Sequence, residues 1–368
     1  AARERWPDYR TSLQPRLLTF RMFGDHVVRH LLALTCLAVL GCSAAGGDRT
    51  VVLGAAGPWT EGYGAMCHRG IELARDEINA AGGIRGAKLE IRFADDSARG
   101  EVAARIARQF VDSARVLGVI GHMSSSAMLA AASVYDGNLV AVATTVTTPA
   151  LSGLSRWVFR VISSDSANGA ALAEAASRLG LRRAAILYEN DGYGRGLSAS
   201  FRSAFKGQVI SNDPIEGNIT NAEPYVAWFK RERPDMVLVA GNDASALVIL
   251  REARRQQLAT QFVGGDGWTP IVQDTAVSEG ALVGAPFTAD DPRPEARTFV
   301  DAFRAKFKLE PDGNAALGYD ATLTLARAVE AKGANRAGIR DWLHRLNAGT
   351  AVLGATGAIR FWPNGDPI

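Results

Sequence analysis

The feature of this sequence that most restricts its fold is a regular alternation of short apolar segments with longer segments of helical periodicity. Apolar runs such as residues 116–120 end at glycine and are short enough to be buried strands. Between the runs, apolar side chains recur at helical spacing, as for Cys67, Ile71 and Ala74. Such an alternation predicts parallel sheets covered by helices on both faces.

The alternation occurs in two successive series, and 368 residues exceed one average domain, so two lobes are expected. The strands predicted for the first series are residues 50–55, 89–93, 116–120, 140–143 and 157–161. Those of the second series are residues 184–188, 209–211, 236–240, 262–264 and 281–285. Helices are predicted at 168–179, 195–205, 225–232, 245–257, 294–306, 314–332 and 335–346, before a last strand at 358–361.

Charge gives little support for a polyanionic partner. The net charge of +3 resides in residues 1–41, which hold six arginines and three acidic residues. Residues 42–368 contain equal numbers of acidic and basic side chains. We therefore expect no nucleic-acid binding.

The N-terminal segment has the features of a secretory signal. Arg29 precedes an apolar run over residues 31–40, which is too short for a permanent transmembrane helix. The run ends at Gly41-Cys42, and residues 39–42 resemble the lipobox of bacterial lipoproteins. This resemblance implies that Cys42 is acylated and becomes the mature N-terminus; an ordinary secretory signal cut nearby is the alternative.

Three further expectations concern the ends and the cysteines. Met22 would begin a signal of ordinary length, so residues 1–21 are interpreted as upstream translation, and the small polar residues 42–49 as a tether. If Cys42 is acylated, Cys67 has no partner, so no disulfide framework is expected.

Residues 119–127 combine a strand end with a helix start. Gly121 stops the apolar run, three serines follow at 124–126, and an alanine-rich segment begins at Ala127. The first N–H groups of a helix lack partners within it, and the helix dipole favours an anion there. A single serine, Ser124 or Ser125, would be enough to cap the helix. Three in succession favour a site for a ligand carboxylate.

Ligands of parallel α/β sheets bind at the carboxyl ends of the strands. The loops at those ends are residues 54–64, 121–126, 144–149, 189–196, 241–243 and 264–268. These loops are rich in Ser, Thr, Tyr, Asn, Asp and Trp and poor in Lys and Arg. This composition favours a small zwitterion or polar molecule over a polyphosphate.

No catalytic or cofactor motif is complete. Leu197 stands where the third glycine of a dinucleotide-binding fingerprint would be, and Tyr63 replaces the lysine of a P-loop. His122 is interpreted as structural, with its ring turned to a backbone group, and the pair Asp95-Asp96 as a turn or helix cap. We expect no cofactor, no metal site and no enzymatic activity.

Several stretches stand out together by their order and spacing: residues 70–74, 77–86 (Glu-Ile-Asn-Ala-Ala-Gly-Gly-Ile-Arg-Gly), 95–96, 119–122, 147–151, 193–196, 262–267 and 357–361. They resemble the branched-chain amino-acid (Leu/Ile/Val) binding proteins of bacterial ABC transporters, over roughly residues 50–368. The resemblance implies a type I periplasmic binding protein, with two doubly wound parallel-sheet lobes joined by a three-segment hinge.

The hinge crossings are expected near Ser163, Pro286 and Thr356. The resulting domain prediction is a leader at 1–41, a tether at 42–49, a first lobe at 50–163 plus 287–356, and a second lobe at 164–286 plus 357–368. The family would add another strand after residue 368, which leaves open whether the chain is a truncated product.

The resemblance also implies roles for single residues. Ser125 and Thr147 would hold the ligand carboxylate, while Asp266, Thr147 and the carbonyl of Thr145 would receive the ammonium. The alternatives are a helix cap for Ser125, loop hydrogen bonds for the threonines and a turn for Asp266. Tyr63 and Tyr193 match aromatic residues that close over the ligand, and Trp59 and Trp268 would add bulk near the mouth of the site. Ser124 and Asn242 complete the candidate ligand-binding residues. Ordinary loop packing is the alternative for the tryptophans.

Two departures from the family are visible. Ala98 and Ser124 replace a cysteine pair of many members, and Asn242 and Asn314 stand where aromatic rings are common. The implied function is that of a monomeric extracytoplasmic lipoprotein in the periplasm or cell envelope. It would bind a branched-chain or related amino acid between the lobes and deliver it to an ABC permease. A ligand-sensing receptor or regulator on the same fold is the alternative.

Overall fold

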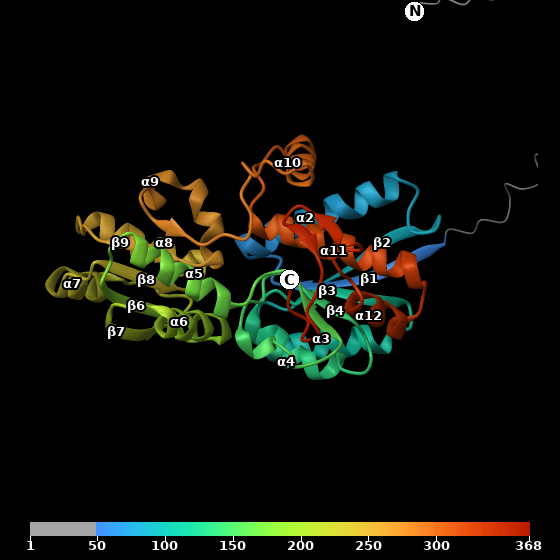
Figure 1. Ribbon diagram of the computed structural model, residues 1–368, viewed down its shortest axis with the longest axis horizontal. Helices are drawn as coiled ribbons and strands as arrows, with labels where there is room; N and C mark the ends of the chain where they lie inside the picture. The colour runs from blue at the N-terminus through green and yellow to red at the C-terminus, as the bar shows by residue number, and fades with distance from the viewer. Residues whose placement is uncertain (1–48) are drawn as a thin grey trace, which may run out of the picture. The chain divides into compact units, whose positions relative to one another are not determined.

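The computed structural model describes residues 49–368 (Figure 1), so the predictions for the leader and Cys42 lie outside the described part. Two five-stranded parallel sheets form the framework, which confirms the predicted fold class. The first sheet has the strand order β2-β1-β3-β4-β5. Its strands are β1 (Thr50–Gly57), β2 (Lys88–Asp95), β3 (Val116–Gly121), β4 (Ala141–Ala143) and β5 (Val158–Arg160).

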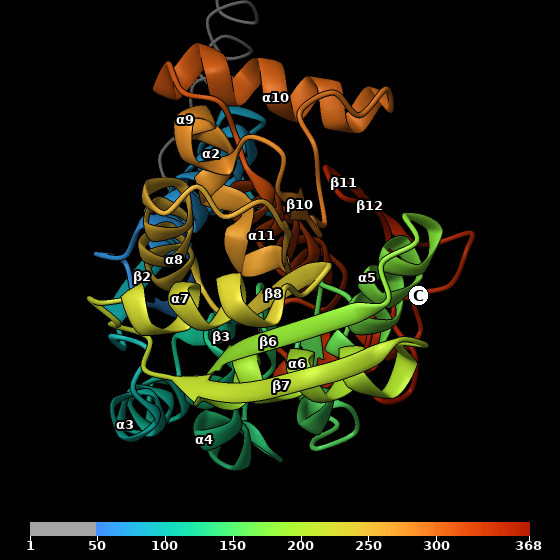
Figure 2. The ribbon, with the colours of Figure 1, turned by 90° about the vertical axis from the view of Figure 1, so that its left-hand side faces the viewer.

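The second sheet has the order β10-β9-β8-β6-β7, and Figure 2 shows β7 at its edge beside β6. Its strands are β6 (Arg183–Glu189), β7 (Gln208–Ile215), β8 (Met236–Ala240), β9 (Gln261–Gly264) and β10 (Leu282–Val283). Every residue of β3 and of β8 is buried, as expected for central strands covered on both faces.

Strand β1 shows how one sheet serves two cores. Leu53 belongs to a core that includes residues of α2 (Gly62–Ala80), α11 (Gly313–Lys332) and α12 (Arg336–His344). The adjacent Val52 belongs to a second core with α3 (Gly100–Asp112) and α4 (Ser125–Tyr135). This alternation follows from the two-residue period of a strand.

The second sheet is covered in the same way. One core contains residues of α7 (Glu223–Glu232) and α8 (Asp243–Arg255), and another contains residues of α5 (Asp165–Arg178) and α6 (Gly192–Ala204). The remaining elements are η1 (Pro149–Leu151), η2 (Asp266–Gln273), α9 (Thr275–Ser278) and α10 (Pro294–Phe307). None of the helices within residues 49–368 has the length and apolar character needed to cross a membrane.

Helices α2 and α11 approach each other unusually closely because both carry glycine at the contact. A Cβ at Gly70 would lie 1.9 Å from the carbonyl oxygen of Ala315, and one at Gly318 would lie 2.5 Å from the carbonyl oxygen of Cys67. A larger residue would force the helices apart. Since α11 carries Asn314 in its first turn, this contact sets the position of one cavity residue.

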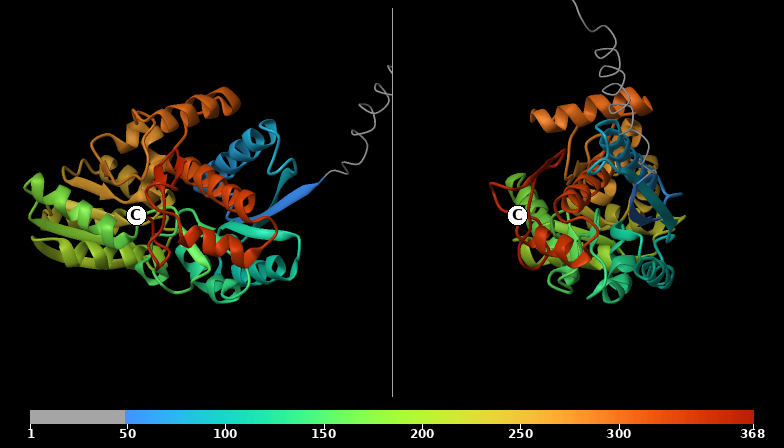
Figure 3. Two further views of the ribbon diagram at one scale, coloured as in Figure 1. Left: turned by 45° about the vertical axis from the view of Figure 1, so that its right-hand side comes forward. Right: turned by 90° about the vertical axis from the view of Figure 1, so that its right-hand side faces the viewer.

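The C-terminal segment differs from the prediction (Figure 3, red). Strand β12 (Gly357–Ile359) does not join the second sheet but pairs antiparallel with β11 (Val352–Gly354), a strand that was not predicted. Phe361 packs against Phe159 of β5, with ring centroids 5.0 Å apart. Residues 357–368, assigned to the second lobe from the sequence, therefore pack with the first lobe.

An ion pair explains the placement of that segment. The guanidinium of Arg160, buried at the end of β5, lies 2.6 Å from a carboxylate oxygen of Asp366. Arg160 also donates to the carbonyls of Val146 and Thr148. A buried arginine requires such partners, so the end of the chain is held against the first sheet.

Candidate functional site

A cavity of about 30 Å³ lies where the strand-end loops of the two sheets meet. Each of the six loops expected from the sequence contributes to its lining, together with the start of α11. The lining residues are Tyr63, Met123, Ser124, Ser125, Thr145, Asp191, Tyr193, Asn242, Asp266, Gly267 and Asn314.

Two serines at the start of α4 differ in their contacts: Ser124 caps the helix, and Ser125 has a hydroxyl without a partner among the described residues. The Oγ of Ser124 accepts a hydrogen bond from the N–H of Ala127 at 3.1 Å, so Ser124 is the helix cap. Ser125 is only 2% exposed, and its Oγ has no hydrogen-bond partner among the described residues. A buried hydroxyl without a partner is costly. Ser125 is therefore the side chain best placed to bind an external group.

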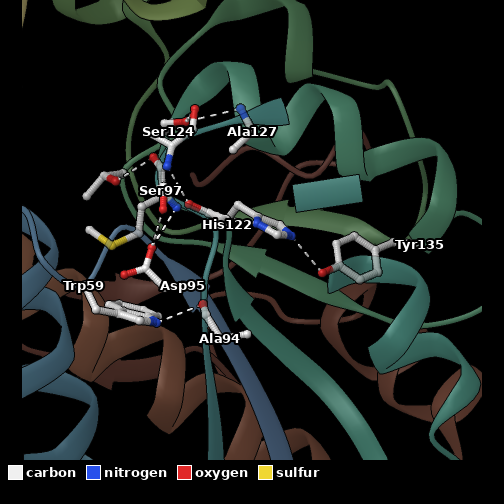
Figure 4. Close-up of polar contacts among 12 residues, drawn as sticks. Trp59, Ala94, Asp95, Ser97, His122, Ser124, Ala127 and Tyr135 are labelled. Carbon is white, nitrogen blue, oxygen red and sulfur yellow. Dashed lines mark hydrogen bonds and ion pairs between the residues drawn. The ribbon is translucent and has the colours of Figure 1, made fainter. Parts of the chain in front are cut away.

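A buried hydrogen-bond network is built around His122 in the loop of residues 121–126, called the serine loop below (Figure 4). The Nδ1 of His122 lies 2.6 Å from the Oδ2 of Asp96, and its Nε2 lies 2.9 Å from the hydroxyl of Tyr135. All three side chains are fully buried. The network ties the loop after β2 to the serine loop and to the end of α4.

This network corrects two details of the sequence interpretation. His122 is structural, but its ring pairs with side chains and not with a backbone group. Asp95 does form the expected turn, accepting from the N–H of Ser97 at 2.7 Å. Its neighbour Asp96 accepts from the N–H of Ala98 and also holds His122, a role that no local signal revealed.

The two threonines of the loop after β4 lie at different depths. Thr145 lines the cavity, and its Oγ1 donates to the carbonyl of Met123 at 2.8 Å. Thr147 is buried beneath the lining, and its Oγ1 has no partner among the described residues. Its carbonyl accepts from the N–H of Asp165 at 2.7 Å.

On the second-lobe side, Asp266 and Tyr193 are held together. The hydroxyl of Tyr193 lies 3.2 Å from Oδ1 of Asp266 and accepts from the N–H of Gly267 at 3.1 Å. Asp266 is half-buried, and desolvation by the surrounding protein raises the pKa of its carboxyl to about 6. Desolvation also raises the pKa of Tyr193 well above its usual value, so the phenol stays neutral.

Asp165 is a neighbouring carboxylate that the sequence analysis missed. It is fully buried at the start of α5, and neither carboxyl oxygen has a hydrogen-bond partner among the described residues. Burial and the nearby carboxylate of Asp266 raise the pKa of Asp165 to about 8. The helix predicted from the sequence begins at residue 168, three residues after the observed start of α5 at Asp165. The useful signal was Ser164-Asp165 as a helix start, with Ser164 as its cap.

Two asparagines and one more carboxylate complete the second-lobe side and its border with α11. The Nδ2 of Asn242 donates to Oε2 of Glu189 at 2.9 Å. The Nδ2 of Asn314 donates to Asp312 and to Thr269, both at 3.1 Å. Asp191 caps α6 by accepting from the N–H of Gly194 at 2.7 Å. Of the lining residues, Met123, Asp191, Gly267 and Asn314 were not among the candidate ligand-binding residues.

A hydrogen bond joins the two lobes beside the cavity. The Oγ of Ser126, at the start of α4, accepts from the N–H of Gly192, at the start of α6, at 3.1 Å. Ser126 therefore contacts the opposite lobe, whereas Ser124 caps α4 and Ser125 has no partner among the described residues.

Two sequence candidates lie outside the lining. The indole N–H of Trp59 donates to the carbonyl of Ala94 at 2.9 Å, and its ring packs edge-on against Phe93 (Figure 4 shows the first contact). Trp268 is fully buried in the core shared with α7 and α8. The ring of Trp268 is thus buried and that of Trp59 partly buried against the protein. Within residues 49–368 no group of acidic, cysteine or histidine residues is suited to a metal ion.

Comparison with known proteins identifies the family to which this architecture belongs. The profile of the family described as "Periplasmic binding protein" matches residues 51–367. The chain belongs to this family. The resemblance inferred from the sequence is thereby confirmed, and the family is one of binding proteins, as expected from the lack of a catalytic motif.

Relatives and solved structures agree with this membership. The chain is 31% identical over 329 residues to an "Amino acid binding protein" of Pseudomonas aeruginosa, covering 85% of this chain and 87% of the relative. It is 31% identical to the Leu/Ile/Val-binding protein of Escherichia coli, covering 77% and 79%. A substrate-binding protein of Desulfitobacterium hafniense, solved with Leu, is similar with a TM-score of 0.74 at 30% identity, covering 87% and 95%. A branched-chain amino acid transporter protein of Streptococcus pneumoniae, solved with isoleucine, has a TM-score of 0.80 at 27% identity, covering 87% and 94%.

Proposed function

We propose that this periplasmic binding protein binds an amino acid between its lobes and delivers it to an ABC permease. The observation that carries the proposal is the division of the cavity. Ser125 and the N-terminus of α4 present donors on one side, and Asp266 presents a carboxylate on the other. A zwitterion has complementary ends, since its carboxylate accepts and its ammonium donates.

The relatives support the ligand class. Two of them carry names that specify amino-acid binding, and two solved neighbours hold Leu and isoleucine. The assignments of Ser125, Thr145, Thr147 and Asp266 to the two charged ends of the ligand are part of the proposal. A ligand that contacts both sides would favour closure of the lobes, because it contacts both only when they are closed.

A thermal-shift screen against the twenty common amino acids tests the proposal. A ligand at 100 times its Kd should stabilise the protein by about 2.7 kcal/mol. Ligand recovered from the protein should be chemically unchanged by mass spectrometry. If no amino acid or related amine shifts the transition, or if the recovered ligand is altered, the proposal is wrong.

We further propose that the protein is a monomer anchored to the cell envelope through lipid on Cys42. The motif at residues 39–42 supports the anchor. Labelled fatty acid should appear on the wild-type protein, and Cys42→Ala should release a soluble form or stall processing. Absence of label on the wild-type protein would contradict the anchor. Sedimentation of the mature chain as a dimer would contradict the monomer.

A further inference from the structure

The second-lobe side of the cavity offers hydrogen-bond acceptors in excess. Asp191 and Asp266 both line it, and none of the lining residues, all within the described part of the chain, is Lys or Arg. Arg195, which follows Asp191 closely in sequence, donates to the carbonyl and side chain of Asn190 instead. Negative charge in the cavity is therefore not neutralised by a basic residue in its lining.

The amide of Asn242 is oriented by Glu189, which accepts one of the two N–H groups of its Nδ2. This Nδ2 donates to Oε2 of Glu189, while Oε1 of Glu189 accepts from the N–H of Asn242 and from Ser245. Because a carboxylate only accepts, these contacts fix the orientation of the amide. Asn242 lines the cavity, and its Oδ1 has no hydrogen-bond partner among the described residues. The carboxylate bonded to Nδ2 polarises this oxygen.

Asn314 repeats this arrangement from the first turn of α11. Its Nδ2 is shared between Oδ2 of Asp312 and the hydroxyl of Thr269, and Asp312 also accepts from the N–H of Ala315. The donor side of this amide therefore faces a carboxylate as well. Burial raises the pKa of both Asp312 and Glu189, as expected for carboxylates without a cationic partner.

An aliphatic ligand side chain would offer no donor to the acceptors that line the cavity. Ser125 and Asp266 would engage the carboxylate and ammonium of an amino acid, so the remaining lining surrounds its side chain. That remainder includes Asn242, Asn314 and the carboxylate of Asp191, together with Met123 and the rings of two tyrosines. Closing such a surface over a hydrocarbon would desolvate acceptors without replacing their hydrogen bonds.

We propose that the ligand is an α-amino acid whose side chain ends in a positively charged hydrogen-bond donor, such as an ammonium. This inference rests on the proposed amino-acid function and narrows it. The α-ammonium of the ligand would pair with Asp266 alone. A second ammonium, on the ligand side chain, would donate hydrogen bonds to Asp191 and to the amide oxygens of Asn242 and Asn314. Charge-assisted hydrogen bonds of this kind are roughly twice as strong as neutral ones.

Matched ligand pairs test the inference on the wild-type protein. L-Ornithine and L-norleucine have side chains of equal length, as do L-2,4-diaminobutyrate and L-norvaline, and each pair differs in an ammonium for a methyl group. Calorimetry should show the amine binding at least tenfold more tightly than the methyl analogue in one or both pairs. Equal or tighter binding of the methyl analogues overturns the inference but leaves the amino-acid function standing. If no α-amino acid in this set or in the screen binds, the proposed function itself falls.

A variant locates the preference. Asn314→Leu replaces an amide acceptor with a hydrocarbon, so it should lower the ratio of ornithine to norleucine affinity at least fivefold. The matched control is Asn138→Leu, an exposed asparagine in the first lobe, which should leave the ratio unchanged. A folded Asn314→Leu protein with the wild-type ratio would exclude Asn314 from selectivity and overturn its part of the inference.

Discussion

The first-lobe and second-lobe sides of the cavity differ in the groups that they present. The first-lobe side is a helix N-terminus whose cap, Ser124, is satisfied and whose neighbour Ser125 is not. The second-lobe side is built from carboxylates and from amides turned toward carboxylates. The donors on the first-lobe side include the backbone N–H groups at a helix start, which do not depend on particular side chains. Acceptors on the other require particular side chains.

This difference between the two sides suggests which residues can change the ligand specificity of related proteins. The helix terminus recognises a carboxylate whatever the rest of the ligand is. The second-lobe side can change ligand class by exchanging single residues, because its groups are side chains on loops. The following predictions test whether the two sides are as separate as the geometry indicates.

The largest effect is expected from Asp266→Asn. The neutral amide cannot form an ion pair with the ligand ammonium, and the loop position should leave the fold intact. Affinity for an amino acid should fall by about 2–5 kcal/mol if the pair is desolvated on closure. Calorimetry measures the loss, with the exposed Asp213→Asn in the same lobe as control. Binding as tight as in the wild type would show that Asp266 is only a turn residue.

The next prediction separates two adjacent serines. Ser125→Ala should weaken the ligand by about 1.5–3 kcal/mol, the range for a hydrogen bond to a charged group, and leave stability unchanged or higher. Ser124→Ala should instead cost about 1 kcal/mol of stability through the lost cap. Calorimetry and denaturant unfolding measure the two effects. If both variants lose stability but neither loses affinity, the loop is only a helix start.

The sequence predicted the fold better than the site. Strand ends could be located because the apolar runs stop there, at glycine for β3 and β8, and each of the six loops selected at strand ends lines the cavity. Strand β12 was predicted, but its antiparallel partner β11 was not, so the hairpin that they form was missed. Asp165 and Asp96 were missed because burial of a carboxylate depends on the tertiary structure and has no local sequence signature. Trp59 and Trp268 lie outside the cavity lining, and a loop position does not reveal which way a ring packs.

The third prediction concerns pH and the unpartnered Asp165. Its pKa, raised to about 8 in the folded protein, exceeds the ordinary value near 4 for an unfolded chain. Between these values the folded state binds more protons, so the stability of the ligand-free protein should decrease as pH rises from about 4 to about 8. Asp165→Asn should remove a part of this decrease on the order of 2 kcal/mol. Urea unfolding at several pH values measures it. An unchanged pH profile would mean that Asp165 finds a partner in solution.

The smallest effect is expected from Tyr135→Phe, which tests whether the first-lobe side depends on its buried support. The change removes the hydroxyl bonded to Nε2 of His122 and leaves the ring in place. A lost hydrogen bond of this kind should cost about 1 kcal/mol of stability. Affinity should fall by less than for Ser125→Ala, because Asp96 still holds the other ring nitrogen of His122. The control is Tyr188→Phe, on β6 of the other lobe, where the ring is half-buried. If Tyr135→Phe lowered affinity as much as Ser125→Ala, the serine loop would depend on this network for its shape, and the donor side would need side-chain support as much as the acceptor side does.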